Sequence, residues 1–164
     1  MRITWNDLTV DFQKHGATDL LEDWRWLIGD SMRLLLVSAI GDMFLANQTG
    51  EVFWLDSGAG QLQRIASNHE EFQQLRQQPQ NADHWFMARL VGDLISGGTR
   101  LAPGQCYSYN VPPSLGGQMT ASNFKPADLS VHFSILGQIQ RQIKDLPPGT
   151  KIKGFGIKNG PVKR

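Results

Sequence analysis

Apolar residues recur at helical spacing at the beginning of the chain. Within residues 4–14, Trp5, Leu8 and Phe12 lie three and four positions apart, which places them on one face of a helix. A second apolar stripe with the same spacing runs through residues 19–27, where acidic residues favour the N-terminal turns. The pattern therefore predicts two helices before residue 30.

Between residues 33 and 65 the pattern changes to short apolar runs separated by turn residues. Asn47 to Gly50 is typical of a tight turn, because Asn bonds its own backbone and Gly tolerates a positive φ. The last run alternates apolar and polar residues, as a half-buried strand does. The segment predicts an antiparallel meander. Its strands are expected at residues 33–40, 43–46, 51–55 and 61–65.

Two more helices are expected after the meander. Ser67 and Glu70 have the spacing of a capping box, in which the side chains bond backbone N–H groups of the first turn. The helix that they begin is expected to end before Pro79. A longer helix is predicted over residues 83–96, closed by the glycine at position 97.

The last third of the chain is less regular. Glycine and proline make residues 99–127 loop-rich, apart from a predicted strand over residues 106–111. Apolar and polar residues alternate over residues 129–135, which predicts a strand, and the ambiguous segment 137–144 is predicted to be helical. Residues 151–157 are expected to form an edge strand, where alternating lysines discourage pairing with another chain.

Together these elements predict a single-domain α+β fold with a central antiparallel sheet flanked by helices. A chain of 164 residues buries enough apolar surface for one core, and no linker separates a second one. We expect the domain to cover residues 1–153 and residues 154–164 to form a basic C-terminal tail.

Charge is distributed unevenly along the chain. The net charge is +1, but residues 1–140 sum to −5 and the residues from Arg141 onward to +6. The acidic body gives no global attraction to nucleic acid, so no nucleic-acid partner is expected, and the basic end is either a solvated tail or an anion contact. The longest apolar run, residues 34–37, is too short to cross a membrane, and no signal peptide is recognisable, which predicts a cytoplasmic protein.

The residues that could carry out chemistry do not form a recognisable set. Cys106 could pair with one of four histidines, His15, His69, His84 or His132, but no cysteine-hydrolase motif surrounds it, so a buried, inert thiol is expected. The histidines lack metal-ligand spacing, and no glycine-rich segment has the helix or lysine of a phosphate-binding loop. We therefore expect neither a metal nor another cofactor.

The chain has five Trp, two Tyr and eight Phe, more than a core of this size needs. Trp24 and Trp26 lie about 200° apart on a helix, so the two are not expected to face the same core. An exposed Trp is typical of protein-binding surfaces, although it can equally cover a neighbouring element. The residues alone thus predict an α+β domain without an assembled catalytic site.

Several short motifs are those of a known family. A hairpin motif consists of IGDMFL at residues 40–45 and GEVFWLD at residues 50–56, and a second run joins LAPGQCY at 101–107 to PPSLGG at 112–117 and to Asn123. Further matches lie at residues 129–133, 137–139 and 146–150. Over about residues 20–152, the chain resembles the C-terminal domain of type VI secretion immunity proteins that neutralise DNase toxins, a former domain of unknown function. The hairpin is more distantly similar to the SUKH immunity superfamily.

The resemblance implies that the protein inhibits a cognate toxin by binding it, without catalysis. Against a DNase, whose cleft is basic, the acidic body supplies electrostatic attraction. The glycines of both motifs, together with Leu115, are expected to be fold determinants. The candidate partner-binding residues are Asp42, Asp56, Tyr107, Asn123, Glu22 and Asp23, of which the first four could instead be fold determinants.

Two other functions stay open at this point. One is a small-molecule or peptide-binding regulatory module, with a pocket between the loop of residues 107–117 and the sheet. The other is an enzyme that depends on Cys106, which the absence of a surrounding motif disfavours.

Overall fold

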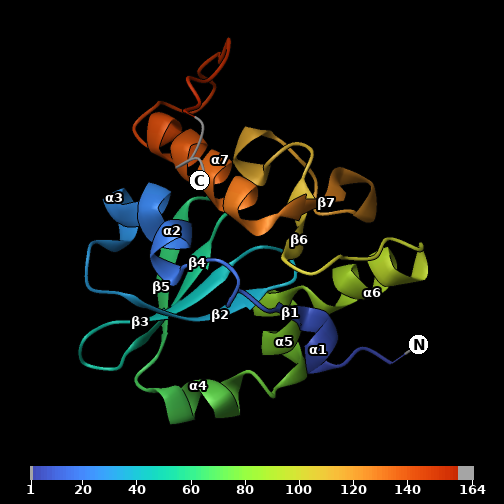
Figure 1. Ribbon diagram of the computed structural model, residues 1–164. Coiled ribbons are helices and arrows are strands. Elements are labelled where there is room, and N and C mark those ends of the chain that lie inside the picture. The colour runs from blue at the N-terminus through green and yellow to red at the C-terminus, as the bar shows by residue number, and fades with distance from the viewer. Residues whose placement is uncertain (1, 159–164) are drawn as a thin grey trace.

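A five-stranded antiparallel sheet forms the centre of the computed structural model, which describes residues 2–158 (Figure 1). Strands that are neighbours in the sheet are also neighbours in the sequence. The predicted meander is therefore confirmed, and a short N-terminal strand is added at its edge. The strands are β1 (Thr9–Val10), β2 (Arg33–Ser38), β3 (Met43–Ala46), β4 (Val52–Asp56) and β5 (Gln61–Ala66).

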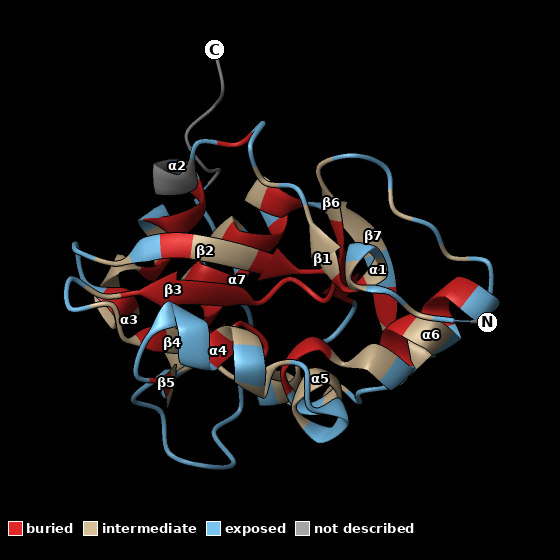
Figure 2. Cartoon of the chain, turned by 90° about the horizontal axis from the view of Figure 1, so that it is seen from below, coloured by how far each residue is buried: buried red, intermediate tan, exposed pale blue. Residues whose placement is uncertain are grey.

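Helices cover both faces of this sheet, which confirms the α+β prediction (Figure 1). On one face, Phe44 of the central strand β3 stacks on Phe72 and Phe86, with ring centroids 5.3 and 4.6 Å away. Figure 2 shows β3 buried along its whole length. The covering helices on this side are α4 (His69–Leu75) and α5 (Pro79–Phe86); on the other side lie α2 (Ala17–Leu21), η1 (Glu22–Trp24), α3 (Arg25–Ile28) and α7 (Leu129–Ile143).

A second sheet of two strands attaches to the first. The backbone N–H of Tyr107 donates to the carbonyl of Ala39, 2.7 Å away, just after β2. One of its strands lies in the segment predicted as loop, so that prediction is wrong for residues 124–128. The remaining elements are α1 (Trp5–Leu8), α6 (Ala88–Ser96), β6 (Gln105–Tyr109), η2 (Pro113–Leu115), η3 (Ala121–Asn123) and β7 (Phe124–Asp128).

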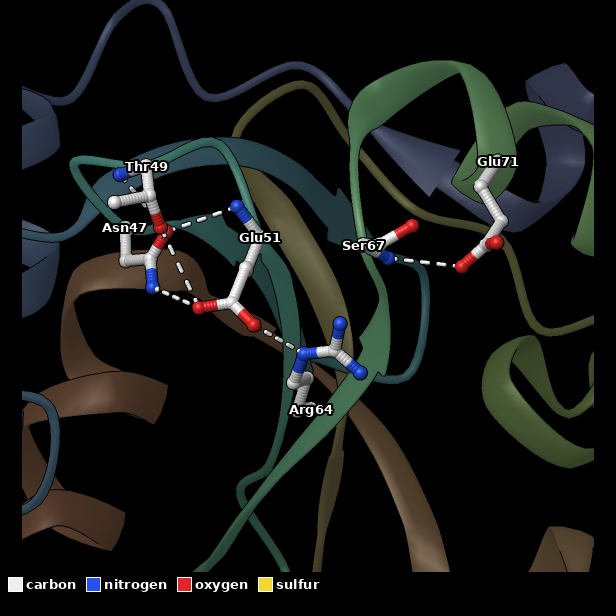
Figure 3. Close-up of polar contacts among 6 residues, drawn as sticks. All are labelled: Asn47, Thr49, Glu51, Arg64, Ser67 and Glu71. Atoms are coloured by element: carbon white, nitrogen blue, oxygen red, sulfur yellow. Dashed lines mark hydrogen bonds and ion pairs between the residues drawn. The ribbon is translucent and has the colours of Figure 1, made fainter.

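The turn between β3 and β4 is held by the Asn47 side chain, as the sequence predicts (Figure 3). Its Oδ1 accepts from the backbone N–H groups of Thr49 and Glu51, at 3.2 and 2.8 Å. Its Nδ2 donates to the Glu51 carboxylate, which also pairs with Arg64 on β5. Gly50 completes the turn with a φ of +88°.

The helix α4 has the predicted reciprocal cap, displaced by one residue. The N-cap is Asn68, whose Oδ1 accepts from the backbone N–H of Glu71 at 2.8 Å. The Glu71 side chain reaches back to the backbone N–H of Ser67, also at 2.8 Å (Figure 3). The prediction of a Ser67–Glu70 box is therefore wrong in register, because Asn68 is at least as good an N-cap as Ser67.

Two predicted helices are interrupted. The helix predicted over residues 4–14 ends at Leu8, because Thr9 and Val10 are β-branched and pair with the edge of β2. The helix predicted over residues 83–96 is two helices, α5 and α6, separated by Met87 at a φ of +52°. The preceding helix α4 ends at Leu75, before Pro79 as predicted, and Pro79 occupies the first turn of α5, where its missing N–H costs nothing.

The strand predicted over residues 129–135 is wrong, because this segment is the first half of the long helix α7. Its apolar residues fit both periods, since Leu129 and Phe133 are also one helical turn apart. In the helix these two are buried, whereas Val131 and Ile135 point outward with 49% and 38% exposed. Asp128 caps the helix by accepting from the backbone N–H of Ser130 at 2.8 Å, which favours helix over strand.

Both tryptophans of the segment predicted as a helix over residues 19–27 contact α7. Trp26 is half-buried there, which is the alternative in which the second tryptophan covers a neighbouring element. Trp24 is fully buried, and its ring stacks on that of Trp26 at 5.9 Å. Their indole N–H groups donate to carbonyls of α7, Phe133 at 3.0 Å and Gly137 at 3.2 Å. The chain avoids the 200° separation because η1 is a 3-10 helix, which ends at Trp24 with φ −111° and ψ 0°.

The basic segment after α7 forms no described strand. Residues 151–158 have no regular secondary structure, so the predicted edge strand over 151–157 is wrong. Residues 159–164 of the predicted tail lie outside the described residues.

Alanine at Gly137 is expected to destabilise the protein, although alanine is the better helix former. A Cβ there would lie 2.5 Å from the backbone oxygen of Asp23, so η1 could not pack against α7. We expect the free energy of unfolding to fall by about 1–3 kcal/mol in urea denaturation. The matched control is Gly92→Ala in α6, where the new Cβ would meet only Ile3 at 3.5 Å. Equal stability of Gly137→Ala and the wild type would contradict the close packing.

Candidate functional site

A cluster of buried polar side chains joins the turns of the main sheet to α7 and β6. The Ser57 hydroxyl lies 3.0 Å from Asp42 Oδ1 and 2.8 Å from the Gly41 carbonyl. His132 of α7 places Nε2 2.8 Å from the same carbonyl and Nδ1 2.6 Å from the Ser108 hydroxyl of β6. All four side chains are buried. The cluster thus connects residues that are far apart in sequence at the centre of the molecule.

His132 is held in its neutral form. Burial lowers the pKa of His132 from 6.5 to about 4, and the bond to the Gly41 carbonyl opposes this only in part. The carbonyl can only accept, so Nε2 carries the proton and Nδ1 accepts from the Ser108 hydroxyl. The close approach requires glycine at position 41, because a Cβ there would lie 2.1 Å from Nε2.

Asp42 is perturbed in the opposite direction. Burial, and then the nearby charge of Asp56, raises the pKa of Asp42 from 3.8 to about 8. Its carboxyl accepts from the Ser57 backbone N–H at 2.9 Å and from the Trp54 indole N–H at 3.1 Å. The interior thus holds a histidine and an acid that are both largely uncharged at pH 7.

A second tether lies further along α7. The buried Gln140 donates from Nε2 to the carbonyls of Ser57 and Gly58, at 3.1 and 3.0 Å, and to the Ser114 hydroxyl at 2.9 Å. Together, His132 and Gln140 fix α7 to two turns of the sheet, the one between β2 and β3 and the one between β4 and β5.

This cluster does not have the geometry of a nucleophilic triad. In a triad the acid orients the histidine and the histidine activates the serine. Here the Asp42 carboxyl bonds Ser57 and Trp54 instead of the His132 ring, and each of these side chains is buried. The arrangement supports packing and register.

The expectation of a buried thiol at Cys106 is confirmed. The residue has no exposed surface, and burial raises the pKa of its thiol far above the ordinary value. The thiolate, which is the nucleophile, is therefore disfavoured at this position.

Among the candidate partner-binding residues, Asp42 and Tyr107 lie inside the protein. Asp42 is 2% exposed, and Tyr107 is also 2% exposed with its hydroxyl donating to the Thr99 carbonyl at 2.8 Å. Asn123 is half-buried and cross-links its own loop, with Nδ2 donating to the carbonyls of Val111 and Gln118 and Oδ1 accepting from the Val111 backbone N–H. The side chains of Asp42, Tyr107 and Asn123 thus stabilise the fold through contacts within the protein.

The other three candidates have surface available. Glu22 is exposed on η1 and lies 4.0 Å from Arg25, and Asp23 beside it is half-buried. Asp56 is half-buried at the end of β4, near Asp42. The structure thus brings Asp42 and Asp56 together but leaves Glu22 and Asp23 on a different element.

Sequence reasoning missed Ser57, Ser108 and Gln140, and it considered His132 only as a partner of Cys106 or as a metal ligand. The usable signal for two of them was their position in α7: in a helix, His132 and Gln140 fall on the same side as the buried Leu129, Phe133 and Leu136. A polar residue within an apolar stripe needs a partner, because burying an unbonded polar group is costly. For His132, the prediction of a strand over residues 129–135 concealed this position on the buried side of a helix.

The loop after β6 contains a small hollow of about 320 Å³, open to solvent. Its lining includes Asn110, Val111, Gly117, Gln118 and Asn123. A second hollow, of about 430 Å³, is lined by Ser114 and Leu115 of the same loop and by residues that follow α7. Both involve the loop at which a regulatory module was expected to have its pocket.

Within the described part of the chain, no three His, Cys, Asp or Glu side chains gather closely enough to hold a metal ion. None of the helices described has the length and apolar character needed to cross a membrane.

Comparison with known proteins identifies a related family. Residues 66–140 match the family model described as "T6SS immunity protein Tdi1, C-terminal", where T6SS is the type VI secretion system. This confirms the predicted resemblance over a shorter range than residues 20–152; the hairpin motif lies outside the matched residues, and the similarity to the SUKH superfamily stays a prediction. No curated protein matches the sequence.

The fold is similar to that of a solved structure. The crystal structure of Atu4351 from Agrobacterium tumefaciens superposes with a TM-score of 0.50 at 17% sequence identity. The match covers 74% of this chain and 64% of that one, so this chain spans less than two thirds of the Atu4351 chain. At this identity the likeness concerns the fold alone.

The buried cluster predicts a pH dependence of stability. The pKa of Asp42 rises from 3.8 in the unfolded chain to about 8 in the folded protein, so its contribution to stability is fully present below pH 3.8 and is lost as pH rises through 8. The pKa of His132 falls from 6.5 to about 4 on folding, so its contribution is fully present above pH 6.5 and is lost as pH falls through 4. The two slopes oppose each other between pH 4 and 6.5, so only that of Asp42 remains from pH 6.5 to 8.

We expect the free energy of unfolding to fall by about 1–2 kcal/mol from pH 6.5 to 8 in urea titrations. Asp42→Asn should remove this slope, whatever its effect on total stability. Asp145→Asn, at an exposed carboxyl, is the control and should retain it. An unchanged slope in Asp42→Asn would contradict the assignment.

Proposed function

We propose that this chain is an immunity protein that neutralises a cognate bacterial toxin by binding it. The observation that carries the proposal is the match of residues 66–140 to a family of type VI secretion immunity proteins. Those residues run from the end of β5 into α7 and include His132, Ser108 and Gln140, so the matched segment contains most of the buried tethers.

Inhibition by binding agrees with the interior of the protein. The cluster residues Ser57, Ser108 and His132 are buried and bonded to one another, to Asp42 or to the backbone, and Cys106 is also buried. They therefore contribute to stability, and binding is left to surface residues. A rigid framework also reduces the entropy lost on association, which favours tight binding. The free thiol of Cys106 fits a reducing compartment, and we place the encounter in the bacterial cytoplasm.

We propose further that the toxin presents a basic surface, as a DNase does. Nucleases need positive charge to bind the phosphate backbone, and residues 1–140 of this chain sum to −5. Complementary charge raises the association rate and discriminates against wrong partners. Glu22 and Asp23, which have surface available on η1, are the acids that we place in this contact.

The test is protection of growth. The toxin encoded beside the gene for this chain is expressed in a bacterium, and co-expression of the wild-type chain should restore growth. Cys106→Ala should protect equally well if it is expressed at the same level, because the proposal needs no chemistry at the thiol. Failure of the wild type to protect, or loss of protection in a folded Cys106→Ala variant, would contradict the proposal.

The same pair of proteins tests the proposed acidic contact. Glu22→Gln with Asp23→Asn should slow association several-fold at low salt, and the difference should disappear near 0.5 M salt, where the Debye length is only about 4 Å. Asp93→Asn with Asp145→Asn removes the same charge from exposed positions elsewhere and is the matched control. Equal rates for the two double variants would show that Glu22 and Asp23 are outside the contact.

A further inference from the structure

The segment that follows α7 turns back and lies along the outer face of that helix (Figure 1). Two glutamines of α7 bind its backbone, and each makes a pair of hydrogen bonds. Gln142 accepts from the N–H of Gly156 at 3.2 Å and donates to the carbonyl of the same residue at 2.8 Å. Gln138 does the same with Lys158, at 2.7 and 2.8 Å.

The spacing of the two glutamines matches that of an extended chain. Residues four apart in a helix are separated by about 6 Å along its axis. Residues two apart in an extended strand are separated by about 6.6 Å. Gln138 and Gln142 can therefore bond two residues of an extended chain that lie two positions apart, as a neighbouring strand would.

These contacts recognise backbone and not side chain. A Cβ built on Gly156 would meet no atom within 4 Å, and the other bonded residue is a lysine. Only the N–H and carbonyl of each bonded residue are used. Any extended segment with free N–H groups at two alternate positions fits the same bonds, and proline at either position does not.

The same face of α7 continues beyond the bonded glutamines. Val131, Ile135, Gln138 and Gln142 fall within one narrow stripe of the helix, since their spacings are four, three and four residues. Val131 and Ile135 are 49% and 38% exposed. The described segment runs from Gln142 toward Gln138, and Val131 and Ile135 lie on the continuation of the same line along the helix.

We propose that the outer face of α7 is a binding site for an extended peptide segment, and that the C-terminal segment of this chain occupies the site in cis. Gln138 and Gln142 bind alternate backbone groups of the peptide, and Val131 and Ile135 extend the site with apolar surface. The C-terminal segment acts as a competitor, so an extended segment from another polypeptide gains the site only by displacing it. The proposal goes beyond toxin neutralisation and does not depend on it.

The test uses full-length protein and a labelled synthetic peptide with the sequence of residues 154–164. Gly156→Pro with Lys158→Pro removes both donated N–H groups and should vacate the site without altering the core. Ile157→Pro is the matched control, because the two glutamines bond the residues on either side of it. Binding of the peptide is measured by fluorescence anisotropy.

We expect the double-proline variant to bind the peptide at least tenfold more tightly than the wild type or the Ile157→Pro control. Adding Gln138→Ala and Gln142→Ala should abolish that gain. Equal affinities for all variants, or a gain that survives loss of both glutamines, would overturn the proposal. Amide exchange in the wild type gives a second readout: protection should be stronger at Gly156 and Lys158 than at Phe155 and Ile157, and it should disappear without the glutamines.

Discussion

Two polar side chains of α7, His132 and Gln140, bond the carbonyls of the turns that close the central sheet, and the rest of the structure depends on these contacts. His132 reaches the Gly41 carbonyl at 2.8 Å, and Gln140 reaches those of Ser57 and Gly58 at 3.1 and 3.0 Å. A buried carbonyl without a partner costs roughly 1–3 kcal/mol. The contacts therefore fix where the helix lies along the sheet, a position that apolar packing alone specifies only loosely.

Close approaches between elements, of α7 and of the segment around β6, explain why several glycines are needed. A Cβ at Gly41 would lie 2.1 Å from the His132 ring, one at Gly58 2.6 Å from the Tyr109 hydroxyl, and one at Gly137 2.5 Å from the Asp23 carbonyl. Gly41 also has a φ of +84°, which other residues rarely adopt. The glycines attributed to the family motifs thus have concrete structural roles at positions 41 and 117, where a Cβ at the latter would meet the Val111 carbonyl at 1.6 Å.

Local sequence patterns predicted the meander, because its strands are consecutive and each turn has its own signal, such as Asn47 and Gly50. They predicted only the second half of α7, as a helix over residues 137–144, since Leu129 and Phe133 fit either period and the deciding feature, the cap at Asp128, is a single residue. The candidate site could be predicted only in part. Glu22 of η1 is exposed and Asp23 is half-buried, so both have surface available, but Asp42 and Tyr107 are buried through pairings with distant residues, which no spacing in the sequence reveals.

The difference between a buried polar interior and acids with exposed surface fits a protein that acts by binding. Its ionisable interior is neutral and enclosed, so the surface can change with the partner while the core stays the same. The most direct test of this account is the protonation state of His132, followed by long-range ¹H–¹⁵N NMR of the imidazole nitrogens from pH 5 to 8. The account predicts a single neutral ring, protonated at Nε2, throughout this range. A His132 signal that titrates near pH 6.5 would contradict it, because the ring would then be open to solvent and the tether between α7 and the sheet would be absent.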